Sequence, residues 1–222
     1  YGLTETTPVA AANAVDDNDP QTVGRPLRGL EIRIGENAEV QVRGASVMRG
    51  YWKRPEDTAR VLSPEGWFST GDQGALENGR LRILGRLKEI IVTSTGEKVS
   101  PADLELAILA DGLFAQAFVA GEARPFIAAF VVLDPEGWRA LAAQSGWDPV
   151  EASLAQPAVR EALLKRVRAA THDFPHYAQP RALRAGLAPW TSENTLLTPT
   201  LKLKRNNLTA HFQTEIEAIY RR

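Results

Sequence analysis

The chain has 222 residues, 44% of them hydrophobic and 24% charged, which is typical of a globular protein and excludes a disordered or fibrous one. Its 26 basic and 27 acidic residues leave a formal net charge of −1, so no nucleic acid is expected as a partner held by bulk electrostatics. The absence of cysteine excludes disulfides and thiolate metal sites, and no apolar run approaches the ~20 residues of a transmembrane segment.

The amino-terminal part of the chain carries the pattern of short β-strands. Leu30–Ile34 and Val40–Arg43 alternate apolar with polar side chains, and a glycine follows each run. Asn78-Gly79 stands between two further runs of this kind and predicts a hairpin, because both residues tolerate positive φ. Pro55–Leu62 predicts a short helix with proline in its first turn.

After Arg86 the pattern changes to mixed α and β. Ser100–Asp103 approximates a capping box with proline at the first helical position, and Leu104 and Ile108 give the helix that follows an apolar face. Phe126–Leu133 is a near-continuous apolar run, which is typical of a buried strand. Two further amphipathic helices are marked by Val159, Leu163, Leu164 and Val167 and by Leu208, Phe212, Ile216 and Ile219.

The change of pattern at Gly85–Lys88 predicts a domain boundary. We expect an α+β fold in which a small, distorted β-barrel or sheet subdomain in residues 1–86 is followed by an α+β domain in residues 87–222.

Two clusters have the spacing of metal ligands, but their neighbours disfavour that interpretation. His172 and His176 are spaced like a helical zinc pair, yet Pro175 between them breaks the helix that would align them. Asp16–Asp19 is similar to a calcium loop, except that Pro20 stands where another oxygen ligand is needed. The chain also contains neither G-x-x-x-x-G-K-[ST] nor G-x-G-x-x-G, so it holds neither standard phosphate-binding loop.

Three separated segments carry the functional signal, and the first two of them offer side chains suited to a nucleotide. Tyr1–Glu5 offers an aromatic ring, a hydroxyl and a carboxylate, which can stack on a base, bond a phosphate oxygen and hold Mg²⁺. Ser69–Asp72 predicts a turn that presents a carboxylate, and a carboxylate can accept both hydroxyls of a ribose. Gly85–Pro101 joins a charged boundary, an apolar strand, a glycine-bearing turn and a capped helix, as expected of a hinge.

In this order the three segments closely resemble those of AMP-forming adenylating enzymes, the superfamily of acyl-CoA synthetases, non-ribosomal peptide adenylation domains and firefly luciferase. Leu197–Arg205 resembles the final lysine motif of that family. The Leu-Thr-Pro-Thr form of this segment, with Phe174-Pro175 and Pro189–Thr191, looks most like long-chain fatty acid–CoA ligases. The resemblance covers essentially the whole chain. It implies that residues 1–86 are the last β-rich subdomain of an incomplete amino-terminal domain and that residues 87–222 form the mobile carboxyl-terminal domain.

The resemblance implies a role for each residue of the first segment. Tyr1 would stack on adenine, and Gly2 would let the backbone approach the base. Thr4 would contact the α-phosphate, and Glu5 would bind Mg²⁺.

Later segments would supply the remaining groups. Asp72 would accept the ribose hydroxyls, and Arg86 would reach the same sugar. Lys88 matches the hinge, and Gly96 would line the tunnel for the pantetheine arm of coenzyme A, where a side chain would obstruct passage. Lys202 would be catalytic together with Thr4 and Glu5. The ammonium of Lys202 would bridge the attacking carboxylate and the α-phosphate.

One residue departs from the common family form, which has glycine immediately before this lysine. Leu201 stands there in this chain. That form is compatible with the long-chain subgroup, but the resemblance then does not fix the geometry of this loop.

The resemblance implies an AMP-binding and ATP-binding ligase of fatty acid metabolism. It would convert fatty acid and ATP to acyl-AMP and pyrophosphate with Mg²⁺, then transfer the acyl group to coenzyme A with release of AMP. The phosphate loop and most of the acyl pocket would lie upstream of Tyr1. We therefore expect a carboxyl-terminal fragment that is inactive alone and lacks the amino-terminal domain of the same chain.

Two alternatives stay open: a ligase that delivers acyl groups to a carrier protein, and a non-catalytic module that keeps the fold. The expected location is cytoplasmic, which is compatible with peripheral contact with the inner face of a membrane.

Overall fold

The computed structural model describes residues 1–221. The chain divides into two compact units, an amino-terminal unit, Tyr1–Glu89, and a carboxyl-terminal unit, Ile90–Arg222. This division lies next to the change of sequence pattern at Gly85–Lys88. Each unit contains hydrophobic clusters of its own.

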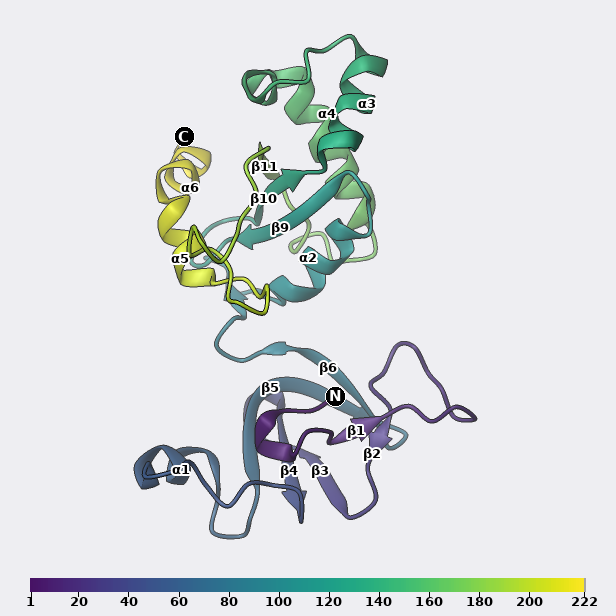
Figure 1. Ribbon diagram of the computed structural model, residues 1–222, viewed down its shortest axis with the longest axis vertical. Coiled ribbons are helices and arrows are strands. Elements are labelled where there is room, and N and C mark those ends of the chain that lie inside the picture. Colours follow the sequence, from purple (N-terminus) through teal and green to yellow (C-terminus); the bar gives the residue numbers. More distant parts are fainter. Residues whose placement is uncertain (222) are drawn as a thin grey trace. The chain divides into compact units, whose positions relative to one another are not determined.

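A four-stranded antiparallel sheet forms the centre of the amino-terminal unit (Figure 1). Its strands follow the order β3-β4-β5-β6, with β3 at Leu30–Ile34, β4 at Glu39–Gly44, β5 at Phe68–Glu77 and β6 at Arg80–Arg86. A ribbon of β1 (Ala11–Ala12) and β2 (Arg25–Pro26) and a short helix, α1 (Pro55–Val61), complete the unit. Ile32, Val40 and Val42 are buried with Leu81, so the alternating runs form half-buried strands as predicted.

The long strand β5 contains the segment that the sequence predicted as a turn, Ser69–Asp72. That prediction is wrong in its secondary structure, because the segment pairs with β4 on either side of an irregularity. Glu39 pairs with Gln73 and Gln41 pairs with Ser69, so the extra residues of β5 bulge out between these two pairs. Gly71 has φ +73° inside the bulge. The predicted hairpin at Asn78-Gly79 is confirmed between β5 and β6.

The carboxyl-terminal unit is a three-stranded sheet with helices on both faces (Figure 1). β10 (Ala128–Leu133) is central, antiparallel to β9 (Phe114–Ala120) and parallel to β11 (Ala182–Gly186). All six residues of β10 are buried, which confirms the predicted buried strand. The other elements are β7 (Ile91–Val92), β8 (Lys98–Val99), α2 (Pro101–Leu109), α3 (Pro135–Ser145), α4 (Pro157–Ala170), α5 (Arg205–His211) and α6 (Gln213–Tyr220).

The two faces of this sheet carry separate hydrophobic clusters. Leu104 of α2 and Leu163 of α4 pack with Val131 of β10 on one face. Leu208 of α5 and Ile216 of α6 pack with residues of the opposite face, such as Phe130. Alternate residues of β10 therefore enter different clusters, as the pleat of a strand requires.

Two local predictions for this unit are wrong. Ser100 precedes α2, but its side chain makes no capping hydrogen bond, and among residues 1–221 its buried Oγ has no hydrogen-bond partner. The last apolar stripe belongs to two helices rather than one, because the chain breaks at Phe212 between α5 and α6. Both helices still direct their apolar side chains into one cluster.

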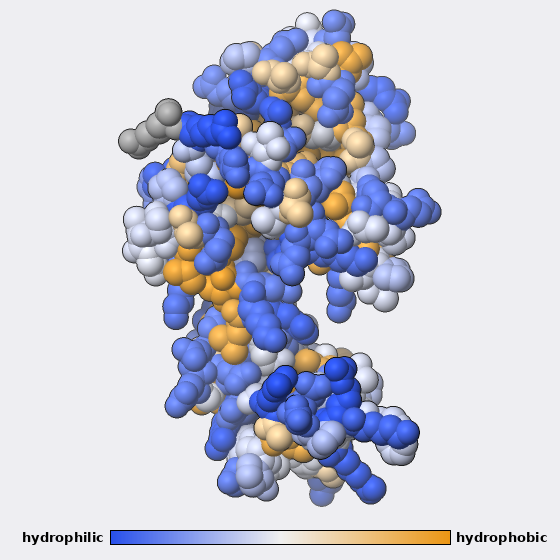
Figure 2. All heavy atoms as spheres, turned by 90° about the vertical axis from the view of Figure 1, so that its left-hand side faces the viewer, coloured by the Kyte–Doolittle hydropathy of each residue, from blue (hydrophilic) through white to orange (hydrophobic). Residues whose placement is uncertain are grey.

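Hydrophilic residues cover most of the face seen in Figure 2, and hydrophobic residues show there as smaller separate areas. Single exposed apolar side chains are normal on a protein surface. No helix within the described residues is both long and apolar enough to cross a membrane.

Candidate active site

Tyr1, Asp72 and Arg86 come together in the amino-terminal unit. The Tyr1 hydroxyl donates a hydrogen bond to Asp72 Oδ2 at 2.7 Å, and Arg86 Nε lies 3.0 Å from Asp72 Oδ1. Asp72 and Arg86 are register partners on β5 and β6, and Asp72 lies within the stretch of β5 that bulges away from β4. Only 8% of the Asp72 side chain is exposed, so its charge is held in a largely buried position by one hydrogen bond and one ion pair.

The hydroxyl of Tyr1 is held in its neutral form. Burial raises the pKa of Tyr1 above its usual range, and the hydrogen bond to the Asp72 carboxylate adds to the rise. The backbone carbonyl of Tyr1 accepts the N–H groups of Ala10 and Ala11, which fixes the start of the chain beside the sheet. Each carboxylate oxygen of Asp72 can accept a second hydrogen bond, so the cluster keeps acceptor capacity for ligand hydroxyls.

Glu5 has a partner that the sequence reasoning missed. The Tyr51 hydroxyl donates to Glu5 Oε1 at 2.9 Å, and burial, followed by the Glu5 carboxylate, raises the pKa of Tyr51. Glu5 lies with Thr4 on a short 3₁₀ helix, Thr4–Thr6, in which Thr4 is exposed. No sequence pattern that we recognised linked position 51 to position 5.

A cavity of about 860 Å³ opens beside these residues in the amino-terminal unit. Glu5, Arg86 and Lys88 line it, together with two arginines of the α1 region, Arg54 and Arg60, that the sequence reasoning missed. Both arginines are bound to Asp57 by ion pairs. The cavity therefore carries charges of both signs, which suits a ligand that brings both phosphate and metal ion.

Lys88 occupies the segment that follows β6. It is exposed, and the flanking backbone is held by Leu87 N–H donating to Gly71 and by Glu89 N–H donating to Arg86. The residue thus lies two residues beyond the last strand of the unit and one residue before the unit ends.

Glycine is present at the two candidate positions, 2 and 96, for different structural reasons. A Cβ on Gly2 would lie 1.8 Å from the carbonyl oxygen of Pro8, so the first loop itself requires glycine. A Cβ on Gly96 would meet no atom within 4 Å, but the residue has φ +84° in the turn between β7 and β8. Gly96 is therefore an exposed turn residue with open space around it.

Lys202 lies in the carboxyl-terminal unit at the tip of a small hairpin. Leu197 and Leu203 form its antiparallel bridge, and Thr198 N–H donates to Lys202 O at 2.8 Å. Lys202 N–H in turn donates to Thr198 Oγ1 at 3.0 Å. Leu201 adopts φ +60°, and both Leu201 and Lys202 are exposed. The hairpin presents the lysine at its tip.

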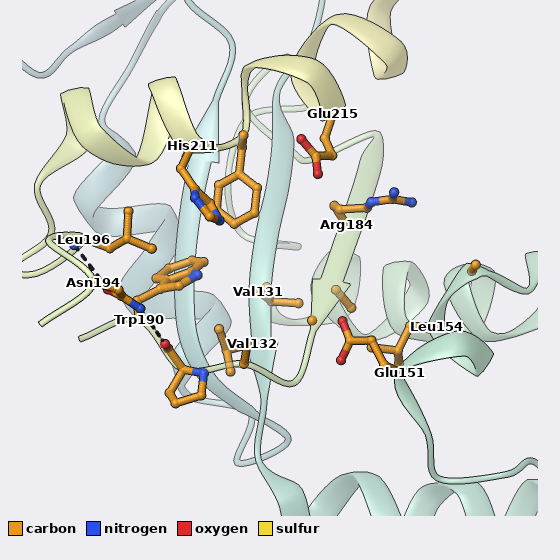
Figure 3. A pocket seen from close by; sticks show the side chains of 16 residues that line it. Val131, Val132, Glu151, Leu154, Arg184, Trp190, Asn194, Leu196, His211 and Glu215 are labelled. Atoms are coloured by element: carbon orange, nitrogen blue, oxygen red, sulfur yellow. Dashed lines mark hydrogen bonds between the residues drawn. The ribbon is translucent and has the colours of Figure 1, made fainter.

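A second cavity, of about 380 Å³, lies in the carboxyl-terminal unit (Figure 3). Trp190 and Phe212 form aromatic walls, while Glu151, Arg184 and Glu215 supply charges at its rim. None of the site residues that the resemblance implies lines this cavity. It is therefore separate from the candidate active site.

The donor set fits magnesium only in part. Among residues 1–221 no group of three or more His, Cys, Asp or Glu side chains could enclose a metal ion. Mg²⁺ is commonly bound by one or two carboxylates together with substrate phosphates and water. Glu5 fits that mode, because it lines the cavity and only Oε1 is engaged by Tyr51.

Comparison with models of known families assigns the chain to one of them. Residues 88–222 match the model of the AMP-binding enzyme C-terminal domain, and residues 1–52 match that of the AMP-binding enzyme. The chain belongs to the AMP-binding enzyme family. The match to the carboxyl-terminal domain begins at Lys88, the last position but one of the amino-terminal unit.

Similar proteins of known name come from bacteria and plants. The chain is 38% identical to the long-chain-fatty-acid–CoA ligase FadD15 of Mycobacterium tuberculosis, over 99% of this chain and 37% of that protein. It is 31% identical to the long-chain-fatty-acid–[acyl-carrier-protein] ligase AEE15 of Arabidopsis thaliana, over 99% of this chain and 32% of that protein. The chain thus spans about a third of the length of these relatives.

Solved structures share the fold. The A domain of carboxylic acid reductase from Segniliparus rugosus, in complex with AMP and a carboxylic acid, matches with a TM-score of 0.77 and 26% identity, over 99% of this chain and 34% of that one. O-succinylbenzoate coenzyme A synthetase from Bacillus subtilis, in complex with AMP, matches with a TM-score of 0.70 and 25% identity, over 94% of this chain and 40% of that one. The mixed α/β fold is that of the carboxyl-terminal part of adenylation domains.

Proposed function

We propose that this chain is the carboxyl-terminal part of a cytoplasmic long-chain fatty acid–CoA ligase. The complete enzyme would form acyl-AMP and pyrophosphate from a fatty acid and ATP, then transfer the acyl group to coenzyme A and release AMP. The observation that carries the proposal is the Tyr1–Asp72–Arg86 cluster. It supplies a ring for a base and a buried carboxylate for ribose hydroxyls beside a charged cavity.

In this proposal the amino-terminal unit holds the nucleotide. The Tyr1 ring stacks on adenine, and the absence of a side chain at Gly2 lets the backbone approach the base. The oxygens of Asp72 accept the ribose hydroxyls with Arg86 beside them. The Thr4 hydroxyl bonds the α-phosphate, and Glu5 holds Mg²⁺, which neutralises phosphate charge during adenylation.

Lys202 supplies the charge that adenylation requires. A carboxylate oxygen of the fatty acid attacks the α-phosphorus, and the bond from that phosphorus to the pyrophosphate leaving group breaks. Two anions must approach each other in this step, so a cation placed between them stabilises the transition state. The exposed ammonium at the hairpin tip is free to serve this purpose.

Thioester formation needs different groups. The coenzyme A thiol attacks the acyl carbonyl and displaces AMP, a step in which no carboxylate approaches a phosphate. We assign Lys88 to the hinge between the half-reactions, and Gly96 to the passage of the pantetheine arm. The open space around Gly96 is consistent with such a passage.

A carrier protein is the alternative acyl acceptor. The Arabidopsis relative AEE15 is named as an acyl-carrier-protein ligase, and the A domain from Segniliparus belongs to a carboxylic acid reductase. Both acceptors present a pantetheine thiol, so the residues of this chain suit either one.

The test uses the complete ligase with ATP, Mg²⁺ and palmitate. We expect pyrophosphate release without any thiol, and palmitoyl-CoA with AMP once coenzyme A is added. Palmitate transfer to a pantetheine-bearing carrier protein, with none to coenzyme A, would replace this proposal by the alternative. If the complete protein turns over no nucleotide with any carboxylate, the result supports the non-catalytic module instead.

The 222-residue chain alone should make no palmitoyl-CoA, and turnover near the rate of the complete ligase would overturn the fragment interpretation.

A further inference from the structure

A buried ion pair lies three residues beyond the proposed catalytic lysine. Arg205 Nη1 donates to Glu105 Oε1 at 2.8 Å, and Arg205 Nη2 donates to Glu105 Oε2 at 2.7 Å. Only 7% of the Glu105 side chain and 19% of the Arg205 side chain are exposed. Glu105 Oε1 also accepts the backbone N–H of Val119 at 2.9 Å. One carboxylate therefore joins α2, β9 and the first residue of α5.

Such a pair is a poor source of net stability. Removing two charges from water costs about as much as their attraction returns, and apolar replacements are often neutral. Its two parallel hydrogen bonds nevertheless fix the guanidinium in one orientation. The value of this pair is therefore geometric, and the question is which part of the chain it positions.

The hairpin that carries Lys202 ends at this pair. The Leu197–Leu203 bridge forms the body of the hairpin, and Lys204 N–H donates to Leu196 O at 2.9 Å at its base. Arg205 follows directly and begins α5. Since the tip is exposed, the location of the Lys202 ammonium depends on how firmly this base is held.

We propose that Glu105 and Arg205 are positioning residues for Lys202. The pair holds the base of the hairpin to α2 and β9, so that the ammonium at the tip occupies one place during adenylation. The proposal rests on the function given above for Lys202. It extends that function to two residues that do not touch substrate.

The same unit offers a matched control. Arg166 Nε donates to Asp111 Oδ2 at 2.8 Å, and Arg166 Nη2 donates to Asp111 Oδ1 at 2.6 Å. This pair is also two-pronged, through Nε and Nη2, but it joins α4 to Asp111, two residues beyond the end of α2, and none of its bonds reaches the hairpin. Arg166→Lys removes one prong there, as Arg205→Lys does at the proposed positioning pair.

The first experiment measures hydrogen exchange in the 222-residue chain and needs no activity. We expect Arg205→Lys to speed exchange of the amides of residues 198–204 about tenfold, while Arg166→Lys leaves them unchanged. Glu105→Gln is the second variant, because it removes the charge and keeps an oxygen that can accept from Val119. Unchanged exchange in residues 198–204 for both Arg205→Lys and Glu105→Gln would overturn the proposal.

The second experiment separates the half-reactions in the complete ligase. We expect Arg205→Lys to slow acyl-adenylate formation about 10- to 100-fold and to spare thioester formation from supplied acyl-adenylate. Lys202→Ala runs in the same assays. If Lys202→Ala leaves adenylation intact, the proposed role of the lysine fails. The hydrogen-exchange experiment still decides whether the Glu105–Arg205 pair holds the hairpin in place. Equal loss in both half-reactions for Arg205→Lys, with Lys202→Ala selective, would overturn the positioning role.

Discussion

Leu201 shows how one side chain can oppose the backbone around it. Its φ of +60° lies in the left-handed region, where a Cβ costs about 1–2 kcal/mol. The common family form has glycine at this position, the residue that adopts positive φ without strain. The residue is 73% exposed, so burial contributes little to offset the strain.

Leu201→Gly should raise the free energy of unfolding by about 1 kcal/mol, because it removes the strain and exposes no buried surface. Urea unfolding of the 222-residue chain measures the change. Ala123→Gly is the control, since Ala123 has φ +53° in another turn and should give a similar gain. A loss of stability at position 201 together with a gain at position 123 would show that the leucine makes stabilising contacts.

At this scale the sequence predicted some groupings and missed others. The resemblance assigned Tyr1, Asp72 and Arg86 to one nucleotide, and the structure brings their side chains together. The partner of Glu5 was missed, because a tyrosine far along the chain has no periodic signature. The Glu105–Arg205 pair was missed for the same reason, since its members are a hundred residues apart in sequence.

Among the elements, α6 is anchored at its end by a half-buried tyrosine. The Tyr220 hydroxyl donates to the backbone carbonyls of Phe126 at 2.9 Å and Ala120 at 3.2 Å, and its ring packs against Phe126. These bonds fasten the helix to the end of β9 and to the segment that leads into β10. Burial raises the pKa of Tyr220 to about 12.

The stability that Tyr220 contributes should therefore disappear at high pH. The folded-state pKa exceeds the unfolded value of 10.0, so the contribution is complete below pH 10 and is lost as the pH rises towards 12. Tyr220→Phe should cost about 1 kcal/mol at pH 8 through the lost hydrogen bonds. Urea unfolding at pH 8 and pH 11.5 measures both proteins. If the difference in free energy of unfolding between the two proteins is the same at both pH values, the raised pKa of Tyr220 is contradicted.

Elements with a local signal were predictable, and elements defined by distant pairing were not. The periodicity of Leu208, Phe212, Ile216 and Ile219 predicted one helix, because the break at Phe212 leaves the apolar face continuous. β11 has a short, mixed sequence, and its pairing with β10 crosses a long connection. α3 had a usable signal that was missed: Asp134 accepts the N–H groups of Glu136 and Gly137 and precedes Pro135.

At the scale of the whole molecule, the hydrophobic clusters respect the division of the chain. One cluster lies entirely within Tyr1–Glu89, and the other two lie entirely within Ile90–Arg222. A unit with its own hydrophobic core can in principle fold alone. The carboxyl-terminal unit has a buried sheet with helices on both faces, so it contains the layers that a domain requires.

Residues 90–222 should therefore fold when expressed without the preceding unit. We expect a cooperative thermal transition, and circular dichroism should show mixed helix and strand. Limited proteolysis of the 222-residue chain should cut first between residues 86 and 90 and release this unit. A non-cooperative transition for residues 90–222 would show that its core depends on the other unit.

Lys202 is the residue on which the proposed chemistry depends most directly. In the complete ligase we expect Lys202→Ala to slow acyl-adenylate formation by about 10²–10³-fold, because a transition state that joins two anions loses its bridging cation. Lys204→Ala is the control two residues away, and it should change the rate far less.

The decisive measurement is the rate of each half-reaction in Lys202→Ala, by pyrophosphate release and by thioester formation from supplied acyl-adenylate. We expect the rate of pyrophosphate release to fall severely, while the rate of thioester formation changes little. Loss confined to thioester formation, or equal loss in both, would contradict the assignment of Lys202 to adenylation.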